Sequence, residues 1–271
     1  MVKQAIIPLA GLGTRLLPLT NVLPKELLPI NGKPGLEYIL DECIEAGIKE
    51  FIFIISVKKK LIKKYFYNDI FFKKILKAKK NDKQLKIQYL KIKKLKKMIK
   101  FVYQNSPRGT GDAVLRCKRL IKSKHFLMVL PDDLIMKSNC SSTMLKLHSQ
   151  YKSSVIASKK VKTNDVSRWG IFKLKKFSKN NFWIKDVVEK PTIKSAPSNY
   201  AVIGRYILPT RIFDVLKNQK PSQNGEIHIT DAIKKLILKK EKFIGHVFAG
   251  KYLDCGTMKG YINSTVEISK I

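Results

Sequence analysis

A short loop near the N-terminus carries the residue types that bind a phosphate chain. The apolar run of residues 5–9 is followed by Ala10-Gly11-Leu12-Gly13-Thr14-Arg15 and then by Lys25. Two glycines let the backbone approach an anion closely, and the exposed amides of such a turn donate hydrogen bonds to it. Arg15 and Lys25 add the positive charge that a polyphosphate needs. The pattern predicts a strand followed by a phosphate-binding loop.

Two other glycine loops do not fit this segment. A Walker loop needs Gly-Lys-Ser/Thr after its second glycine, whereas Gly13 is followed by Thr14 and Arg15. The dinucleotide fingerprint needs a third glycine where Leu16 stands, so a nicotinamide or flavin site is disfavoured. The alternative is a glycine turn that closes a strand and has an incidental surface arginine.

Carboxylates follow two further apolar segments. Pro131-Asp132-Asp133 comes directly after residues 126–130, and Asp254 follows a predicted strand at 243–248. A carboxylate at the tip of a buried strand is a common ligand of Mg²⁺, which takes one or two protein carboxylates and fills its shell with phosphate oxygens and water. For an Asp-Asp pair in a loop, the alternative is a turn or a helix cap.

The segment Glu189-Lys190-Pro191 follows an alternating strand at 184–188. Because neighbouring side chains of a strand point to opposite faces, its simplest interpretation is a surface ion pair ahead of a turn. As ligands, the two residues suit a sugar phosphate. Glutamate accepts hydrogen bonds from vicinal hydroxyls, and lysine is a compact charge for a phosphate monoester.

Taken together, these motifs resemble the sugar-nucleotide pyrophosphorylases, the nucleotidyltransferases that join a nucleoside triphosphate to a sugar 1-phosphate. The resemblance covers nearly the whole chain in the right order. It continues through four further segments: Trp169-Gly170, Ala196-Pro197-Ser198-Asn199, Ile203-Gly204-Arg205-Tyr206 and Gly225-Glu226-Ile227-His228-Ile229-Thr230-Asp231-Ala232-Ile233.

The resemblance implies a role for each motif. The loop cradles the triphosphate, and Mg²⁺ is held by Asp132 and Asp254. Glu189 binds sugar hydroxyls and Lys190 the sugar phosphate. The sugar-phosphate site implied in this way consists of Gly170, Glu189, Lys190 and Gly204.

Pro24-Lys25-Glu26 resembles the branch of the family that uses UTP and glucose 1-phosphate, whereas the glucose-1-phosphate thymidylyltransferases, which use dTTP, usually carry Ser-Lys-Gln. In the uridylyl branch Gln104 matches the residue that reads the uracil edge. The nucleotide site implied in this way consists of Ala10, Gly11, Gly13, Thr14, Arg15, Lys25, Gln104 and Gly109.

The mechanism that we infer is an in-line displacement. A phosphate oxygen of glucose 1-phosphate attacks the α-phosphorus of UTP and expels pyrophosphate. No general base is needed, because the second ionisation of a phosphomonoester lies near pH ~6. The catalytic residues are then Arg15, Lys25, Asp132 and Lys190, and none of the four histidines (His125, His148, His228 and His246) is required.

The chain departs from the family pattern in two places. The segment from Tyr65 to Lys100 is far more basic and aromatic than the acidic helices of the family. The family generally has Gly-Leu-Gly-His-Ala where this chain reads Gly109-Thr110-Gly111-Asp112-Ala113, so an acid stands near the expected nucleotide pocket. Our interpretation is that Asp112 caps the helix that begins there. The alternative is that it faces the triphosphate and weakens nucleotide binding by repulsion.

Along the chain, apolar strands alternate with helical stretches. This predicts an α/β fold of the Rossmann-like kind, with a mixed, mainly parallel sheet flanked by helices and ligand sites at the carboxyl ends of its strands. Strands are predicted at 3–9, 51–55, 126–130, 154–161, 200–208 and 243–248, and helices at 35–47, 58–66, 111–121, 142–151, 210–217, 230–240 and 257–268.

The chain has 271 residues, and no linker or internal repeat divides it. We expect a single nucleotidyltransferase domain over 1–271, with a nucleotide-binding part at about 1–135 and a sugar-binding part at about 136–271. We expect no leader segment, and no apolar run is long enough to span a bilayer. Four cysteines without a Cys-x-x-Cys pair fit a reducing cytoplasm and no zinc site.

The formal charge of +35 is the main observation that favours another function, a basic nucleic-acid-binding protein on the same fold. Such an excess attracts nucleic acid or anionic membrane at low salt. The excess is carried by lysine, with only seven arginines, whereas selective recognition of phosphates and bases favours arginine. We interpret the lysine runs as solvated helix faces and expect no specific nucleic acid and no membrane partner. The resemblance implies a homo-oligomer, a dimer or a tetramer, and self-repulsion opposes it.

Overall fold

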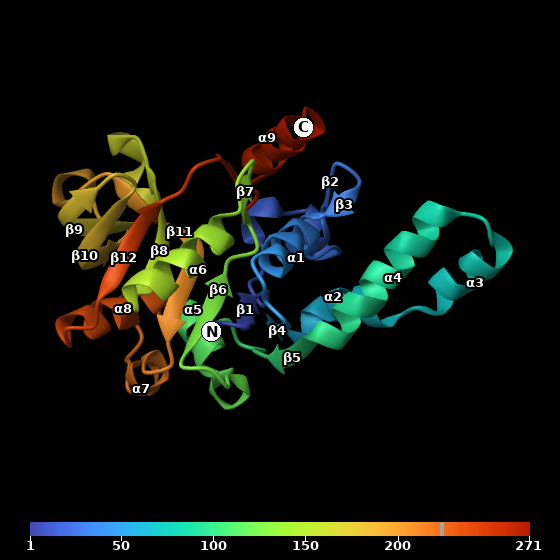
Figure 1. The fold of residues 1–271 in the computed structure, drawn as a ribbon. Coiled ribbons are helices and arrows are strands. Elements are labelled where there is room, and N and C mark those ends of the chain that lie inside the picture. The colour runs from blue at the N-terminus through green and yellow to red at the C-terminus, as the bar shows by residue number, and fades with distance from the viewer. Residues whose placement is uncertain (223–224) are drawn as a thin grey trace.

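A nine-stranded mixed sheet forms the centre of the computed structural model, which describes residues 1–222 and 225–271 (Figure 1). The strands in spatial order are β5 (Ile99–Tyr103), β4 (Glu50–Ile55), β1 (Gln4–Pro8), β6 (His125–Val129), β11 (Tyr200–Pro209), β8 (Ser154–Lys160), β12 (Phe243–Val247), β10 (Asn181–Glu189) and β9 (Gly170–Ser178).

The two halves of the sheet differ in strand direction. β5, β4, β1 and β6 are parallel neighbours, as the β-α alternation of the first half predicts. From β11 onward the pairs are antiparallel, except for the parallel pair of β8 and β12. The mixed sheet is confirmed, and its mainly parallel character belongs to the first half of the chain.

Helices cover both faces of this sheet. The helices in chain order are α1 (Gly35–Glu45), α2 (Lys60–Tyr67), α3 (Ile70–Ala78), α4 (Lys83–Met98), α5 (Thr110–Leu115), α6 (Cys140–Tyr151), α7 (Ile212–Lys217), α8 (Ile229–Leu238) and α9 (Met258–Ser269). The predicted helix at 111–121 ends at Leu115 and is followed by the 3-10 turn Lys118–Leu120, after which Ile121 packs partly buried against the core.

Strand residues alternate between two cores. Ile7 and Phe53 pack with α1, α2 and α6 on one face, whereas Ile6, Ile52 and Ile54 pack with α5, α7 and α8 on the other. Both faces are therefore buried, which is why these strands read as continuous apolar runs rather than as an alternation with polar residues.

Two features stand outside this layered arrangement. α3 and α4 form an arm that extends away from the sheet, and α3 has no buried residue (Figure 1). Two short ladders, β7 (Asp133–Met136) with β13 (Lys251–Asp254) and β2 (Pro29–Ile30) with β3 (Lys33–Pro34), lie beside α9, where the Tyr261 hydroxyl donates to the Pro29 carbonyl. No helix in the described part of the chain is long and apolar enough to cross a membrane.

Candidate active site

The glycine loop leaves β1 at the carboxyl edge of the parallel half of the sheet. Gly13 has a φ of 72° and precedes the 3-10 turn Thr14–Leu16. A side chain at Gly13 would be strained by this left-handed backbone, and its Cβ would lie 3.1 Å from Thr20 Cγ2. Leu16 is buried beneath the turn, so the loop is anchored while Arg15 stays exposed.

A cavity of about 370 Å³ opens beside this loop. This cavity is lined by all eight residues that the sequence predicted for nucleotide binding. They come from three separate segments: after β1, before α1, and between β5 and α5. They are Ala10, Gly11, Gly13, Thr14, Arg15, Lys25, Gln104 and Gly109. The parallel strands bring these segments together because their carboxyl ends share one edge.

Asp132 follows β6 at the same edge and is neutralised by two cations. Lys25 Nζ lies 2.6 Å from Asp132 Oδ2, and Arg15 Nη2 lies 4.0 Å from it. Burial lowers the pKa of Lys25, but the charges of Asp132 and Glu26 outweigh burial, so its pKa is raised overall. Burial alone raises the pKa of Asp132, and the Lys25 ammonium reverses the effect and lowers it. Both groups are therefore charged at neutral pH.

Asp254 reaches Asp132 through the β7–β13 ladder. Asp254 pairs with Asp133 at the end of that ladder, and the Cys255 amide donates to the Asp132 carbonyl at 2.8 Å. The two carboxylates converge at Gly256, where a Cβ atom would lie 2.8 Å from Asp132 Oδ2 and 3.1 Å from Asp254 Oδ1. Two carboxylates more than 120 residues apart thus face one small space.

A second cavity of about 470 Å³ adjoins the first, and Arg15, Leu130 and Asp132 line both. Gly170, Glu189 and Lys190 from the predicted sugar-phosphate set line it. Gly204 is not among its lining residues; the Gly204 amide instead donates to Asp133 Oδ2 at 2.8 Å.

The backbone at Lys190 explains how an adjacent acid and base face one cavity. Lys190 has a φ of 43°, in the left-handed region, and its amide donates to the Trp169 carbonyl at 3.1 Å. This turn breaks the strand alternation from which opposite faces were expected. Glu189 is held in place by the Thr230 hydroxyl, which donates to Glu189 Oε2 at 2.8 Å.

Comparison with known proteins agrees with this geometry. The model of the nucleotidyl transferase family matches residues 4–270. The chain belongs to this family. The UTP–glucose-1-phosphate uridylyltransferase of Pseudomonas aeruginosa is 35% identical over 98% of this chain and 95% of its own, and a putative one of Bacillus subtilis is 36% identical over 100% and 98%.

Solved structures of nucleotidyl transferases also superimpose closely. The UTP-bound UGPase of Acinetobacter baumannii has a TM-score of 0.89 at 30% identity over 99% of this chain and 93% of its own. An apo UDP-glucose pyrophosphorylase has a TM-score of 0.90 at 34% identity over 100% and 99%. The predicted fold and the predicted resemblance are confirmed.

Sequence reasoning missed two contributors to the site of this nucleotidyl transferase. Arg168 Nη2 lies 3.2 Å from Asp254 Oδ2, and its guanidinium stacks on the Trp169 ring. Asp133 accepts from the Tyr252 hydroxyl at 2.6 Å as well as from Gly204. Arg168 directly precedes Trp169-Gly170, and this position was the signal that could have revealed it. Nothing near Asp133 in the sequence reveals its contact with Tyr252.

The structure corrects the interpretation of Asp112. Asp112 lies in the first turn of α5, but Gly109 is the N-cap residue and no side chain caps the helix. Asp112 Oδ2 instead accepts from Gln104 Nε2 at 2.6 Å and from Arg116 Nε at 2.9 Å.

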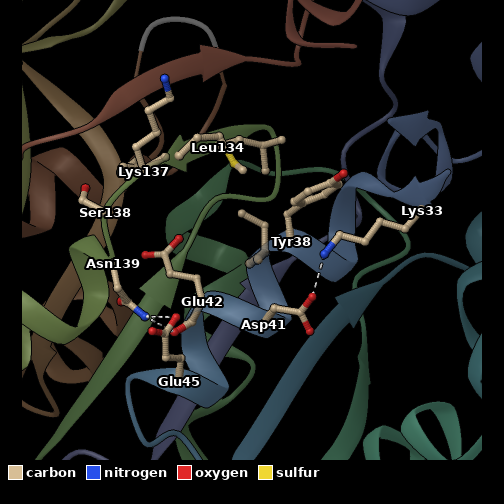
Figure 2. Close-up of a pocket in the computed structure, with 12 residues that line it drawn as sticks. Lys33, Tyr38, Asp41, Glu42, Glu45, Leu134, Lys137, Ser138 and Asn139 are labelled. Carbon is tan, nitrogen blue, oxygen red and sulfur yellow. Dashed lines mark hydrogen bonds and ion pairs between the residues drawn. The ribbon is translucent and has the colours of Figure 1, made fainter. Parts of the chain in front are cut away.

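The histidines of the described residues and a separate acidic cluster lie outside the two cavities. No histidine in the described part of the chain lines either cavity, and no group of three or more His, Cys, Asp or Glu residues is placed there to hold a metal. A separate hollow of about 400 Å³ beside α1 contains Asp41, Glu42 and Glu45 (Figure 2). Their carboxylates accept from Lys33, Arg205 and Asn139, respectively, so this acidic cluster is already satisfied.

Proposed function

We propose that this nucleotidyl transferase makes UDP-glucose and pyrophosphate from UTP and glucose 1-phosphate. The observation that supports it most directly is the pair of adjoining cavities that share Arg15 and Asp132. The residues predicted for the nucleotide line one cavity, and Glu189 and Lys190 line the other. A triphosphate and a sugar phosphate bound in the two cavities meet at the shared wall. The names of the curated relatives fit this assignment.

The proposed reaction is a single displacement at phosphorus. A phosphate oxygen of glucose 1-phosphate forms a bond to the α-phosphorus of UTP while the bond from that phosphorus to the bridging oxygen breaks, and pyrophosphate leaves. The nucleophile is largely dianionic at neutral pH, because the second pKa of its phosphate is about 6. Catalysis is then a matter of positioning and of neutralising charge.

Three cationic side chains would neutralise the phosphates of the two substrates. Arg15 and Lys25 stand beside the glycine loop, where they would neutralise the β- and γ-phosphates that leave as pyrophosphate. Lys190 lines only the second cavity, where it would hold the phosphate of the sugar. In the structure Lys25 is paired with Asp132, and the charge of Asp132 helps to raise the pKa of Lys25, so its ammonium stays charged.

Asp132 and Asp254 fit a magnesium site. Their oxygens converge at Gly256, which leaves room for an ion because it carries no side chain. Two carboxylates suit Mg²⁺, which completes an octahedral shell with phosphate oxygens and water. When bound, the ion would supply further charge neutralisation at the phosphates of the reacting nucleotide. Lys25 and Arg168, which now contact these carboxylates, would turn toward the phosphates.

On the sugar side, Glu189 is the proposed acceptor for hexose hydroxyls. Thr230 fixes one of its oxygens, and the other is available to a ligand. Gly170 packs tightly at this point, since a Cβ atom there would lie 3.2 Å from Glu189 Oε2. We retain Gly204 in the proposed site through its bond to Asp133, which lines the cavity.

The test is pyrophosphate release from purified protein with Mg²⁺ and glucose 1-phosphate. We expect release with UTP, weaker release with dTTP, and loss of release in Asp132→Ala. Asp214→Ala is the matched control, because Asp214 also pairs with a lysine but lies in neither cavity. Preference for dTTP would support the thymidylyltransferase alternative, and no release with any triphosphate and hexose 1-phosphate would contradict the proposal.

We further propose that the enzyme works in the cytoplasm as a dimer or tetramer. Cys43, Cys117 and Cys140 are buried free thiols, which suits a reducing compartment. Sedimentation velocity across a range of salt concentrations tests the assembly, since salt screens the repulsion between copies of a chain with a charge of +35.

A further inference from the structure

The amide of Gln104 is held by two acceptors in the wall of the nucleotide cavity. Gln104 Nε2 lies 2.6 Å from Asp112 Oδ2 and 3.3 Å from the Gly109 carbonyl oxygen. Gln104 is 3% exposed and Asp112 is 9% exposed, so solvent competes little with these bonds. Gln104 and Gly109 both line the nucleotide cavity.

These contacts determine which end of the amide is left for a ligand. A side-chain amide has two donor hydrogens on nitrogen and an oxygen that only accepts. A carboxylate and a carbonyl also only accept, so the nitrogen must face Asp112 and Gly109. Both hydrogens are then used, and Oε1 is what the side chain can offer to a base.

Arg116 keeps Asp112 in this role. Arg116 Nε donates to the same oxygen that accepts from Gln104, at 2.9 Å, and Nη2 lies 3.4 Å from Oδ1. The arginine also balances the charge of Asp112 beside a cavity that is to hold a triphosphate. The acid therefore serves the base-binding side chain rather than the helix terminus.

We propose that Asp112 is a positioning residue for base recognition. It orients Gln104 so that Oε1 accepts the N3 hydrogen of uracil, and this makes the site selective for uracil over cytosine. At N3, uracil carries a hydrogen, whereas cytosine carries a lone pair that would face the lone pairs of Oε1. The inference rests on the proposed function only in that it places the nucleotide in this cavity.

Equilibrium binding of UTP and CTP in the presence of Mg²⁺ tests the inference without requiring turnover. We expect the wild-type chain to bind UTP roughly tenfold or more tightly than CTP. With CTP, the buried Oε1 of Gln104 would face the N3 lone pair, and neither acceptor would have a hydrogen-bond donor. In Asp112→Ala the amide is free to rotate, and the ratio should fall toward one. Arg119→Ala is the matched control, since Arg119 is an exposed arginine of the same segment that lines neither cavity.

Two further measurements separate positioning from a merely structural role. Asp112→Leu keeps the branching at Cγ but has no acceptor, and it should lower the ratio as Asp112→Ala does. In the wild-type chain, 3-deaza-UTP, which lacks the N3 hydrogen, should bind roughly tenfold more weakly than UTP, and Gln104→Ala should remove that difference.

The outcomes are distinct. Equal weakening of UTP and CTP in the Asp112 variants, or an unchanged ratio, would overturn the inference. So would equal binding of UTP and 3-deaza-UTP by the wild-type chain, a result that holds even if neither Asp112 variant folds. If the wild-type chain binds neither UTP nor CTP, the nucleotide site of the proposed function is wrong as well. UTP-dependent pyrophosphate release together with equal binding of UTP and CTP would overturn this inference alone.

Discussion

Lys190 shows how one backbone angle decides what a motif can do. Its left-handed φ of 43° turns the lysine into the cavity that Glu189 also lines. A non-glycine residue in this region is uncommon and costs conformational energy, which the surrounding contacts must offset. The sequence showed the Glu-Lys pair but not this turn, because nothing in the residue types themselves requires it.

Replacing this lysine should affect the chemistry and leave the fold intact. We expect Lys190→Ala to lower kcat by roughly a hundredfold or more, as for the loss of one group that stabilises charge in a transition state. Its thermal unfolding should match that of the wild-type chain, because the side chain is exposed. Lys194→Ala, an exposed lysine four residues on, is the control, and near wild-type turnover by Lys190→Ala would remove Lys190 from the mechanism.

Asp133 should make the stability of the fold depend on pH. Burial, followed by the neighbouring charge of Asp132, raises its pKa to about 6. Between its unfolded value of ~3.9 and this pKa, the folded chain binds more protons than the unfolded chain, so the contribution of Asp133 is most favourable at low pH and falls as pH rises through 6.

Urea unfolding at pH 4 and pH 7 measures this effect. Relative to Asp133→Asn, the free energy of unfolding of the wild-type chain should fall by about 1 to 3 kcal/mol over that interval. Asp214→Asn is the comparison, because the pKa of Asp214 is lowered by its bond to Lys118 rather than raised. A difference between wild type and Asp133→Asn that does not vary with pH would be inconsistent with the raised pKa.

At the scale of elements, a buried ion pair fastens α1 to the sheet. Arg205 on β11 is fully buried and donates to both oxygens of Glu42 on α1, with Nη2 at 2.7 Å. Ser141 on α6 donates to the same carboxylate. One charged pair therefore joins two helices and a strand beneath the site.

Removing one partner of this pair should destabilise the fold strongly. We expect Glu42→Ala to lower the free energy of unfolding by about 3 to 5 kcal/mol, because Arg205 is left charged and buried without its carboxylate, with only backbone carbonyls as acceptors. The double variant Glu42→Leu, Arg205→Met should recover much of that loss, since it removes both charges. Denaturant unfolding decides the point, and a single variant as stable as the wild type would contradict it.

The elements that the sequence predicted are those with continuous apolar runs or clear helical periods. The strands around β1, β4 and β6 were predicted because both of their faces are buried. β9 was missed because its apolar start gives way to Lys173, Lys175 and Lys176, all exposed, which hide the strand period. The glycine loop follows β1 and Asp132 follows β6, as the strand pattern predicts. Arg168 and Tyr252 contact this region from distant segments, which the strand pattern does not reveal.

Much of the positive charge of the molecule is carried by an arm that lies apart from the two cavities. α3 and α4, the arm in Figure 1, are rich in lysine, and Lys86, Lys93, Lys94 and Lys97 are exposed along α4. None of these residues lines either cavity. The charge should therefore act as a surface property, with no consequence for substrate binding.

A single-stranded RNA provides the test of this separation. We expect weak binding that falls by roughly a hundredfold or more between 50 and 200 mM salt, since several lysine–phosphate contacts release counterions together. Replacing Lys86, Lys93, Lys94 and Lys97 by glutamine should flatten the salt dependence and leave pyrophosphate release unchanged. Nanomolar binding of one defined RNA that persists at high salt would mean that the arm carries a specific nucleic-acid site, because counterion release alone cannot produce affinity that salt does not weaken.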